Sequence, residues 1–270
     1  MNPIQSILVH VDAGPHNASR LQVARELGGR LGSGVTALYA VTSVYVEMAA
    51  GLTSRSATDA LLALDEEQLA AARKAVATAN AEPGVQIEWR EAPEAPEHSF
   101  IRQALYADLL VLGQYDRDHR HAGVLPDFVQ SVLIASGKPA LVVPCIGVQR
   151  SSFDTAFVAW KESREAARAV TAALPILRAA SKVHVGLEAE RSGGLDVQRF
   201  LHRHGVEAQV HTLTGDTPQA GDLMLSMAAD LGADLMVMGC YGHSRARELV
   251  LGGASRTVLD SMTLPVLMAH

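Results

Sequence analysis

The chain contains an internal repeat, and this repeat constrains its fold more than any other feature. Residues 106–144 align without a gap with residues 232–270, at a constant offset of 126, and 12 of the 39 positions are identical. Any two α/β halves can share apolar strands, but a register kept through a glycine and a proline indicates a duplicated domain. The identical residues are Ala107/Ala233, Asp108/Asp234, Leu109/Leu235, Val111/Val237, Gly113/Gly239, Tyr115/Tyr241, Val124/Val250, Leu125/Leu251, Val132/Val258, Leu133/Leu259, Pro139/Pro265 and Leu141/Leu267.

Short apolar runs alternate with helical segments in both halves, which is typical of a mostly parallel sheet covered by helices on both faces. The polar stretch at 146–152 separates the halves, so we expect domains at 1–147 and 152–270, joined through their last strands. Expected strands are 7–11, 35–41, 85–91, 109–112 and 140–143, then 156–160, 183–187, 206–213, 235–238 and 266–269. Expected helices are 19–31, 56–79, 99–105 and 128–135, then 164–177, 195–204, 218–231 and 255–262. In the segment 56–79 one helical face carries Leu61, Leu64, Leu69, Ala72 and Val76.

The composition excludes several classes of protein. The 23 basic and 29 acidic residues give a net charge of −6, and no basic run is present, which argues against binding to nucleic acid or anionic membranes. The two cysteines, Cys145 and Cys240, form neither a disulfide framework nor a cysteine-rich zinc site. No signal peptide and no membrane-spanning apolar run is evident, so we expect a cytoplasmic protein.

The best candidate for a ligand site follows the expected strand 235–238. Gly239 and Gly242 come first, then nine residues, then Gly252 and Gly253 before an apolar helix. Glycines permit close backbone approach, and the start of a helix presents N–H groups and a positive dipole end to an anion. Taken alone, a glycine pair would favour an ordinary turn and a helix start over a ligand site.

The Gly-x2-Gly-x9-Gly spacing and its surroundings, ADLMVMGCYGHSR, LVLGGASRTVL and LPVLMAH, resemble the universal stress protein family. Together with the duplication, the chain is similar to tandem members of that family. The resemblance implies two Rossmann-like or flavodoxin-like α/β domains, of the adenine nucleotide alpha hydrolase-like type. Each would hold a mostly parallel five-stranded sheet, and a pseudo-two-fold axis would relate them. It also implies a stress-response protein that binds ATP or AMP, with Mg²⁺ accompanying ATP.

The resemblance places the nucleotide in the second half. Gly239 and Gly242 would approach the ribose and phosphates, and Gly252 would open the second turn. The backbone of Gly253 and Ala254 would bind phosphate oxygens, and Ser255 would offer a hydroxyl. The remaining site residues would be Met238 at the entrance, Leu187 near the base, and Lys161 and His243 near the phosphates.

The chain departs from the family pattern in both halves. Binding members carry Ser or Thr where Gly253 stands, and an acidic residue where Lys161 stands. The first half keeps that acidic residue as Asp12, but Asp116, Pro126 and Asp127 replace loop glycines. Because proline removes a donor and the aspartates repel phosphate, we expect no nucleotide in the first half.

Other motifs predict no chemistry. His119/His121 and His202/His204 lack further ligands, so no metal site is expected. Residues 192–196 resemble a pyrophosphatase loop only in part, and no catalytic set is evident. We therefore expect a regulatory nucleotide-binding module that acts on an unidentified protein partner and is not a dedicated enzyme. A nucleotide-free scaffold, a slow ATPase using His243, and a homodimer remain alternatives.

Overall fold

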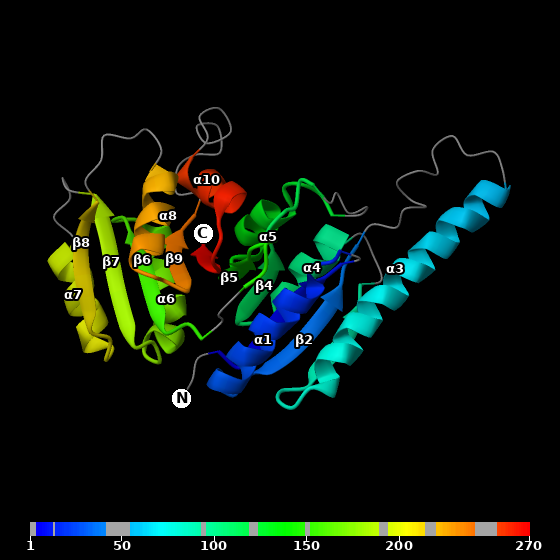
Figure 1. Cartoon of the computed structure of the whole chain (residues 1–270), viewed down its shortest axis with the longest axis horizontal. Coiled ribbons are helices and arrows are strands. Elements are labelled where there is room, and N and C mark those ends of the chain that lie inside the picture. The colour runs from blue at the N-terminus through cyan, green and yellow to red at the C-terminus, as the bar shows by residue number, and fades with distance from the viewer. Residues whose placement is uncertain are drawn as a thin grey trace. The chain divides into compact units, whose positions relative to one another are not determined.

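The computed structural model describes residues 4–12, 14–41, 55–92, 96–118, 124–148, 152–188, 194–213, 220–240 and 253–270. The chain forms two compact units, residues 4–136 (the N-terminal unit) and residues 137–270 (the C-terminal unit) (Figure 1). Each unit is an α/β structure built around a largely parallel sheet, as the repeat predicts. Every described element has the type that the sequence predicts, and its ends differ by at most three residues.

The N-terminal unit has a parallel sheet in the order β3-β2-β1-β4. Its strands are β1 (Ser6–Val11), β2 (Gly34–Tyr39), β3 (Ile87–Glu91) and β4 (Leu109–Gly113). Its helices are α1 (Asn17–Leu31), α3 (Arg55–Ala81), α4 (Pro96–Ala104) and α5 (Phe128–Ser136). β1 and β4 are the central strands and are almost wholly buried, which explains their continuous apolar sequence.

The C-terminal unit has a sheet in the order β5-β10-β9-β6-β7-β8. Its strands are β5 (Ala140–Val143), β6 (Thr155–Trp160), β7 (Lys182–Glu188), β8 (Ala208–Leu213), β9 (Leu235–Gly239) and β10 (Val266–Ala269). Its helices are α6 (Arg164–Leu177), α7 (Gly194–Arg203), α8 (Ala220–Asp230) and α10 (Ala254–Ser261). β5 pairs antiparallel with β10, which confirms that the last strands of the two repeats meet, and the other described pairings are parallel.

The repeated aspartate fixes the strand register in both units. The Asp108 carboxylate accepts hydrogen bonds from the backbone N–H groups of Gln5 and Ser6, at 2.8 and 3.0 Å. The Asp234 carboxylate accepts the equivalent bonds from Asp154 and Thr155, both at 2.9 Å. Asp108 thereby links the start of β4 to the start of β1, and Asp234 links the start of β9 to the start of β6. The repeat therefore preserves a structural contact as well as an apolar pattern.

The long helix α3 buries only part of its apolar face. Ala72 and Val76 are buried, but Leu64 is 40% exposed. At 1.5 Å per residue this 27-residue helix is about 40 Å long, whereas a six-residue strand such as β2 spans about 20 Å. The helix therefore extends past the sheet it covers, as Figure 1 shows. Among the described residues, no helix is long and apolar enough to cross a membrane.

Candidate functional site

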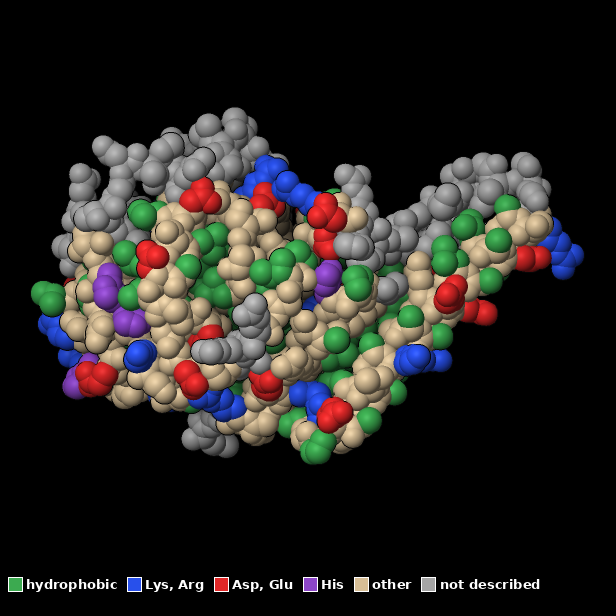
Figure 2. Space-filling view, viewed as in Figure 1, with side chains coloured by type: hydrophobic (Ala, Val, Ile, Leu, Met, Phe, Trp, Pro, Cys, Tyr) green, Lys and Arg blue, Asp and Glu red, His purple; other side chains and the backbone are tan. Residues whose placement is uncertain are grey.

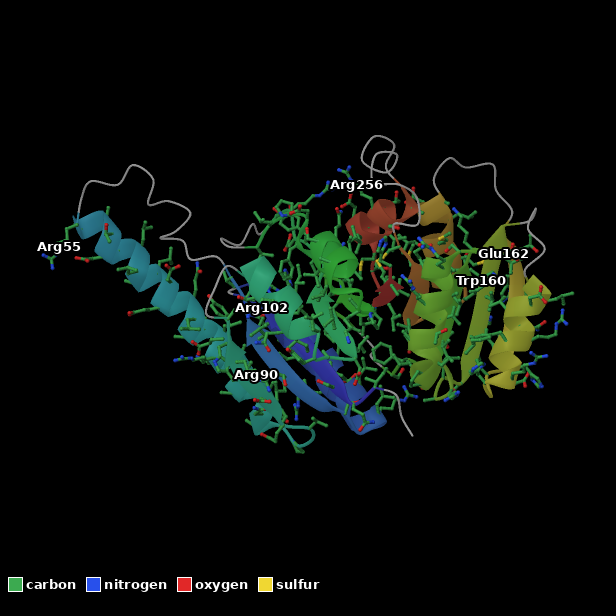
Figure 3. The ribbon with its side chains drawn as sticks, turned by 180° about the vertical axis from the view of Figure 1, so that it is seen from behind. Arg55, Arg90, Arg102, Trp160, Glu162 and Arg256 are labelled. Carbon is green, nitrogen blue, oxygen red and sulfur yellow. The ribbon has the colours of Figure 1, made fainter. Side chains whose placement is uncertain are left out.

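Four of the predicted site residues lie at one edge of the sheet in the C-terminal unit. Lys161 follows β6, Leu187 lies near the end of β7, and Met238 and Gly239 end β9. β6 pairs in parallel with both β7 and β9, so their carboxyl ends meet at this edge. Figure 3 shows Trp160 and Glu162, the neighbours of Lys161, toward the same end of the unit as Arg256 of α10. The indole N–H of Trp160 is buried there without a hydrogen-bond partner.

The start of α10 contributes backbone donors to this edge. β9 and β10 run parallel, so the helix between them runs back across the sheet and begins at the carboxyl edge. Gly253 is the N-cap in an extended conformation and has no side chain to bind the N–H groups of the first turn. Ala254 and Ser255 are the first two helical residues, and Ser255 is buried. The other predicted residues, Gly242, His243 and Gly252, lie outside the described residues.

Gly239 has a packing role that the sequence does not reveal. A Cβ atom on Gly239 would lie 2.3 Å from the backbone nitrogen of Ala166 and 2.6 Å from the carbonyl carbon of Glu165. The first turn of α6 therefore rests directly on the backbone of Gly239, and no side chain fits between them. The requirement for glycine here comes from helix packing, whether or not a ligand approaches.

Glu165 adds a buried negative charge in the first turn of α6. Its carboxylate is almost fully buried and pairs with the exposed guanidinium of Arg164 at 3.2 Å. Burial alone raises the pKa of Glu165, but hydrogen bonds from its own backbone N–H and from Ser163, together with Arg164, lower the pKa below its ordinary value. The edge thus combines Lys161 and the start of a helix with the ionised carboxylate of Glu165.

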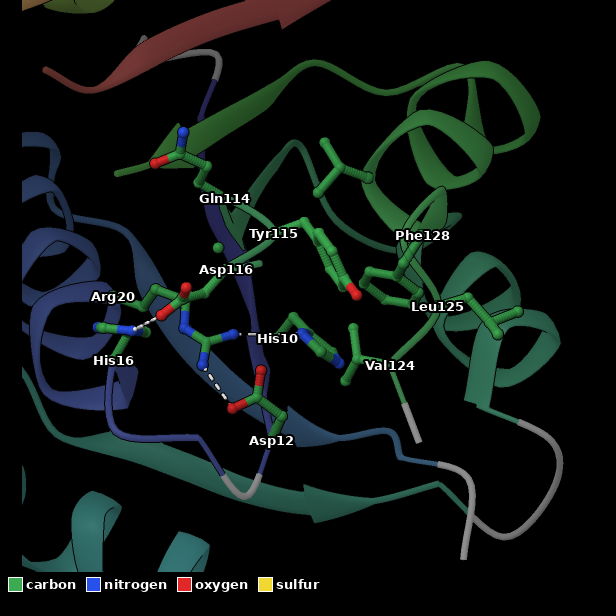
Figure 4. Close-up of a pocket in the computed structure, with 12 residues that line it drawn as sticks. His10, Asp12, His16, Arg20, Gln114, Tyr115, Asp116, Val124, Leu125 and Phe128 are labelled. Atoms are coloured by element: carbon green, nitrogen blue, oxygen red, sulfur yellow. Dashed lines mark hydrogen bonds and ion pairs between the residues drawn. The ribbon is translucent and has the colours of Figure 1, made fainter. Parts of the chain in front are cut away.

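The carboxyl ends of the strands and the start of the following helix form a corner in each unit. In the N-terminal unit, polar side chains largely fill this corner. Arg20, on the buried face of α1, binds the Asp12 carboxylate at 2.7 Å (Figure 4). It also donates to the Asn17 side-chain oxygen at 2.7 Å. The Asp12 carboxylate also accepts a hydrogen bond from the Gly14 backbone N–H at 2.7 Å. Arg20 is 3% exposed, and its Nε has no hydrogen-bond partner. A cavity of about 30 Å³, room for little more than water, remains beside these groups.

His10 completes this cluster. Its Nε2 lies 2.9 Å from the Ala40 carbonyl oxygen, and its Nδ1 lies 3.3 Å from an Arg20 guanidinium nitrogen. Nδ1 can only accept from the guanidinium, so the ring is neutral and Nε2 donates to Ala40. Burial lowers the pKa of His10 to about 4. The charge of Asp12 opposes this shift, and the charge of Arg20 adds to it. Burial raises the pKa of Asp12, but the charge and hydrogen bond of Arg20 outweigh it and hold that pKa well below its ordinary value.

A second polar pair lies at the rim of the same cavity, where His16 Nε2 is 2.8 Å from the Asp116 carboxylate. With Asp12 committed to Arg20 and Asp116 to His16, both acidic groups already have cationic or hydrogen-bonding partners. Asp12 is therefore not poised to receive a ribose. No group of three or more described His, Cys, Asp or Glu side chains could hold a metal ion.

The sequence pattern did not reveal the residues that fill this corner: His10, His16, Asn17 and Arg20. One signal was available, because Arg20 falls on the buried face of α1, among Leu21, Ala24 and Leu27. An arginine at such a position needs an anionic partner, and Asp12 at the end of the preceding strand is the nearest in sequence.

The two corners differ at equivalent positions. Aligning β1 with β6 pairs His10 with Ala159, Asp12 with Lys161, Asn17 with Ala166 and Arg20 with Ala169. In the N-terminal unit the Arg20 side chain separates α1 from Gly113, since a Cβ there would meet Arg20 at 3.1 Å. In the C-terminal unit small residues allow α6 to contact Gly239 directly. The same backbone corner is thus packed in two ways.

Both repeats match one known protein family. The model of the universal stress protein family matches residues 3–144 and 155–270, one match for each repeat. The chain belongs to the universal stress protein family. This confirms the resemblance seen in the motif of the second half and in the duplication.

Solved structures show the same tandem fold. A universal stress protein from Archaeoglobus fulgidus DSM 4304 is 19% identical and covers 98% of this chain and 95% of its own, with a TM-score of 0.72. A second one, described as a putative universal stress protein from Pseudomonas aeruginosa UCBPP-PA14, is 17% identical and covers 98% of this chain and 92% of its own, with a TM-score of 0.59. The α/β fold of two tandem domains is therefore confirmed.

A curated relative matches over a shorter stretch. Universal stress protein Slr1230 from Synechocystis is 34% identical over 70 residues, which are 26% of this chain. The matched stretch spans only 23% of that relative's length.

Proposed function

We propose that this universal stress protein is a cytoplasmic regulatory module that binds an adenine nucleotide, ATP or AMP, in its C-terminal unit. Binding of the nucleotide would regulate its interaction with a protein partner. ATP would bring Mg²⁺ with it. The module would act by binding and not as a dedicated enzyme. The nucleotide would occupy the edge formed by Lys161, Leu187, Met238 and the first turn of α10.

The observation that carries this proposal is the start of α10. An eight-residue helix begins there after Gly253, which has no side chain to cap it, so the positive end of the helix dipole favours an anion at this place. Lys161 supplies a positive charge at the neighbouring strand end. The N-terminal unit has Asp127 directly before α5, and a negative charge in that place disfavours a phosphate.

Glu165 favours the alternative of a nucleotide-free interaction scaffold. Its buried carboxylate at the start of α6 repels a phosphate unless Arg164 and Lys161 offset it. Analysis by mass spectrometry of small molecules released from the purified protein separates the two functions, because only the first predicts a co-purifying adenine nucleotide.

Substitutions at Gly253 test the nucleotide site with a matched pair of variants. Both Gly253→Ser and Gly253→Asp supply a helix N-cap, so both variants should be at least as stable as the wild type. Serine restores a neutral hydroxyl donor, and the affinity for ATP should rise by several-fold. Aspartate places a negative charge at the phosphate position, and the affinity should fall by more than about tenfold.

Calorimetric titration of ATP and AMP into the three proteins measures this order of affinity, while thermal unfolding verifies the stabilities. Equal affinities for the serine and aspartate variants would contradict a phosphate at α10. Absence of binding by both the wild type and the serine variant would favour the scaffold.

A further inference from the structure

Two histidines from neighbouring strands of the C-terminal unit face each other away from the proposed nucleotide edge. His184 of β7 and His211 of β8 place Nδ1 and Nε2 2.9 Å apart, with ring centroids separated by 5.1 Å. β7 and β8 are parallel, and Gly186 is the residue directly opposite His211. The absent side chain of Gly186 allows the two rings to meet diagonally across the strands.

The pair lies on the face of the sheet opposite α7. A Cβ on Gly194 of α7 would contact Leu187 and Val210, so these residues point toward α7. Side chains alternate along a strand, and His184 and His211 therefore point to the other face. His184 is 7% exposed and His211 is half-buried, so solvent reaches the pair from the side of β8. Figure 2 shows histidine side chains at the surface over β7 and β8.

We infer that His184 and His211 form a two-histidine site for a divalent transition-metal ion such as Zn²⁺, Ni²⁺ or Cu²⁺. Imidazole nitrogens are preferred ligands of these ions, at about 2.0–2.1 Å. Two such nitrogens on one ion are about 2.9 Å apart at a right angle and about 3.3 Å apart in a tetrahedron. Rotation of the two rings then satisfies the ion without moving the strands.

The surroundings of the pair limit how strongly it holds an ion. Burial lowers the pKa of His184, and the neighbouring His211 and Lys182 lower it further. No third described His, Cys, Asp or Glu joins the two rings, so water or an external group fills the remaining positions. Lys182 opposes a cation, and we expect moderate affinity as a result.

Zinc chloride and nickel chloride titrated into tag-free protein at pH 7.5, followed by calorimetry, test the site. The wild type should bind one ion per chain, and both His211→Ala and His184→Gln should lose this binding or weaken it more than about tenfold. His202→Ala is the matched control, because His202 is an exposed histidine of the same unit paired with Glu207, and its loss should change nothing. Lys182→Gln should tighten binding about two- to threefold, because it removes a nearby positive charge.

Thermal unfolding provides a second measurement. Excess Zn²⁺ should raise the melting temperature of the wild type and of the His202 variant, but not that of the His211 variant, which lies on the edge strand β8. Equal metal binding by the wild type and both pair variants would overturn the inference, since the ion would then sit on other histidines. Failure of the wild type to bind either ion at millimolar concentration would also overturn it.

Discussion

The buried histidine of the N-terminal unit should make that unit acid-sensitive well above the range in which its carboxylates titrate. His10 is 1% exposed, donates to Ala40 and accepts from Arg20, so only the neutral ring fits. Its pKa is about 4 in the folded protein against 6.5 for an exposed histidine. The unfolded chain therefore binds a proton as the pH falls below 6.5, whereas the native state does not bind it until about pH 4. Stability from this group is full above pH 6.5 and is lost as the pH falls.

The size of the effect follows from the two pKa values. A difference of 6.5 − 4 units corresponds to about 3 kcal/mol of unfolding free energy once the pH has fallen to 4. About 2 kcal/mol of this loss should already appear between pH 7 and pH 5. The lowered pKa of Asp12 affects stability in a different pH range. Asp12 contributes its full share of the unfolding free energy above its ordinary pKa of 3.8, and this share is lost only as the pH falls below that value.

His10→Gln isolates this effect, because an amide can still donate to Ala40 and does not titrate. Each compact unit contains one of the two tryptophans, Trp89 and Trp160, so urea unfolding can be followed separately in each unit. In a Trp160→Phe background, Trp89 fluorescence reports the unfolding free energy of the N-terminal unit. The decrease of this free energy from pH 7 to pH 5 should be about 2 kcal/mol smaller with glutamine at position 10 than with histidine. In a Trp89→Phe background, Trp160 fluorescence should show the same pH dependence with histidine or glutamine at position 10. The same loss between pH 7 and 5 in the N-terminal unit with either residue would refute this account of the cluster.

Three further substitutions and one control variant test the packing, the strand register and the ion pair. In urea unfolding, Gly239→Ala should destabilise the C-terminal unit by at least about 2 kcal/mol, because its Cβ would overlap backbone atoms of α6. The control is Gly29→Ala in helix α1, which should be neutral or stabilising because its Cβ would have its nearest contact at 3.8 Å. Asp234→Ala should lower the unfolding free energy by about 2 kcal/mol, because the backbone N–H groups at the start of β6 lose their acceptor; an unchanged midpoint would contradict the register role. Arg20→Met should cost the N-terminal unit about 3–5 kcal/mol by leaving the Asp12 carboxylate buried without its partner, and a loss below about 1 kcal/mol would show that water replaces the guanidinium.

The sequence was sufficient to predict the architecture because the architecture depends on patterns that repeat. Apolar runs, helix periods and the offset of 126 predict the order of strands and helices and the meeting of β5 with β10. The repeated pair Asp108/Asp234 was visible as well, but its purpose was not. Only the folded chain shows that each carboxylate receives N–H groups more than 75 residues away, which no local pattern encodes.

The contents of the two strand-end corners could not be predicted in the same way. The distance between a helix and the strand beneath it is a tertiary outcome, and it decides whether Arg20 is a buried ion-pair partner or a surface residue. Similarly, the position of Gly239 in a nucleotide-binding motif suggested a ligand contact. In the folded chain, the backbone of α6 packs against Gly239, in the space that a side chain there would occupy. The Gly239 position thus satisfies a packing requirement and cannot by itself indicate binding.

The two corners are packed so differently that one cannot be converted into the other by a single substitution. In the N-terminal unit, His10, Asp12 and Arg20 support one another, so replacing one of them leaves a buried charge or an unfilled space. In the C-terminal unit, α6 occupies the corresponding space with its own backbone. Exchange between the two arrangements therefore requires several simultaneous substitutions and a shift of a helix. The proposed anion site is therefore tested best at a position where a substitution needs no such shift. Gly253 at the start of α10 is such a position, and serine and aspartate there should have opposite effects on affinity and similar effects on stability.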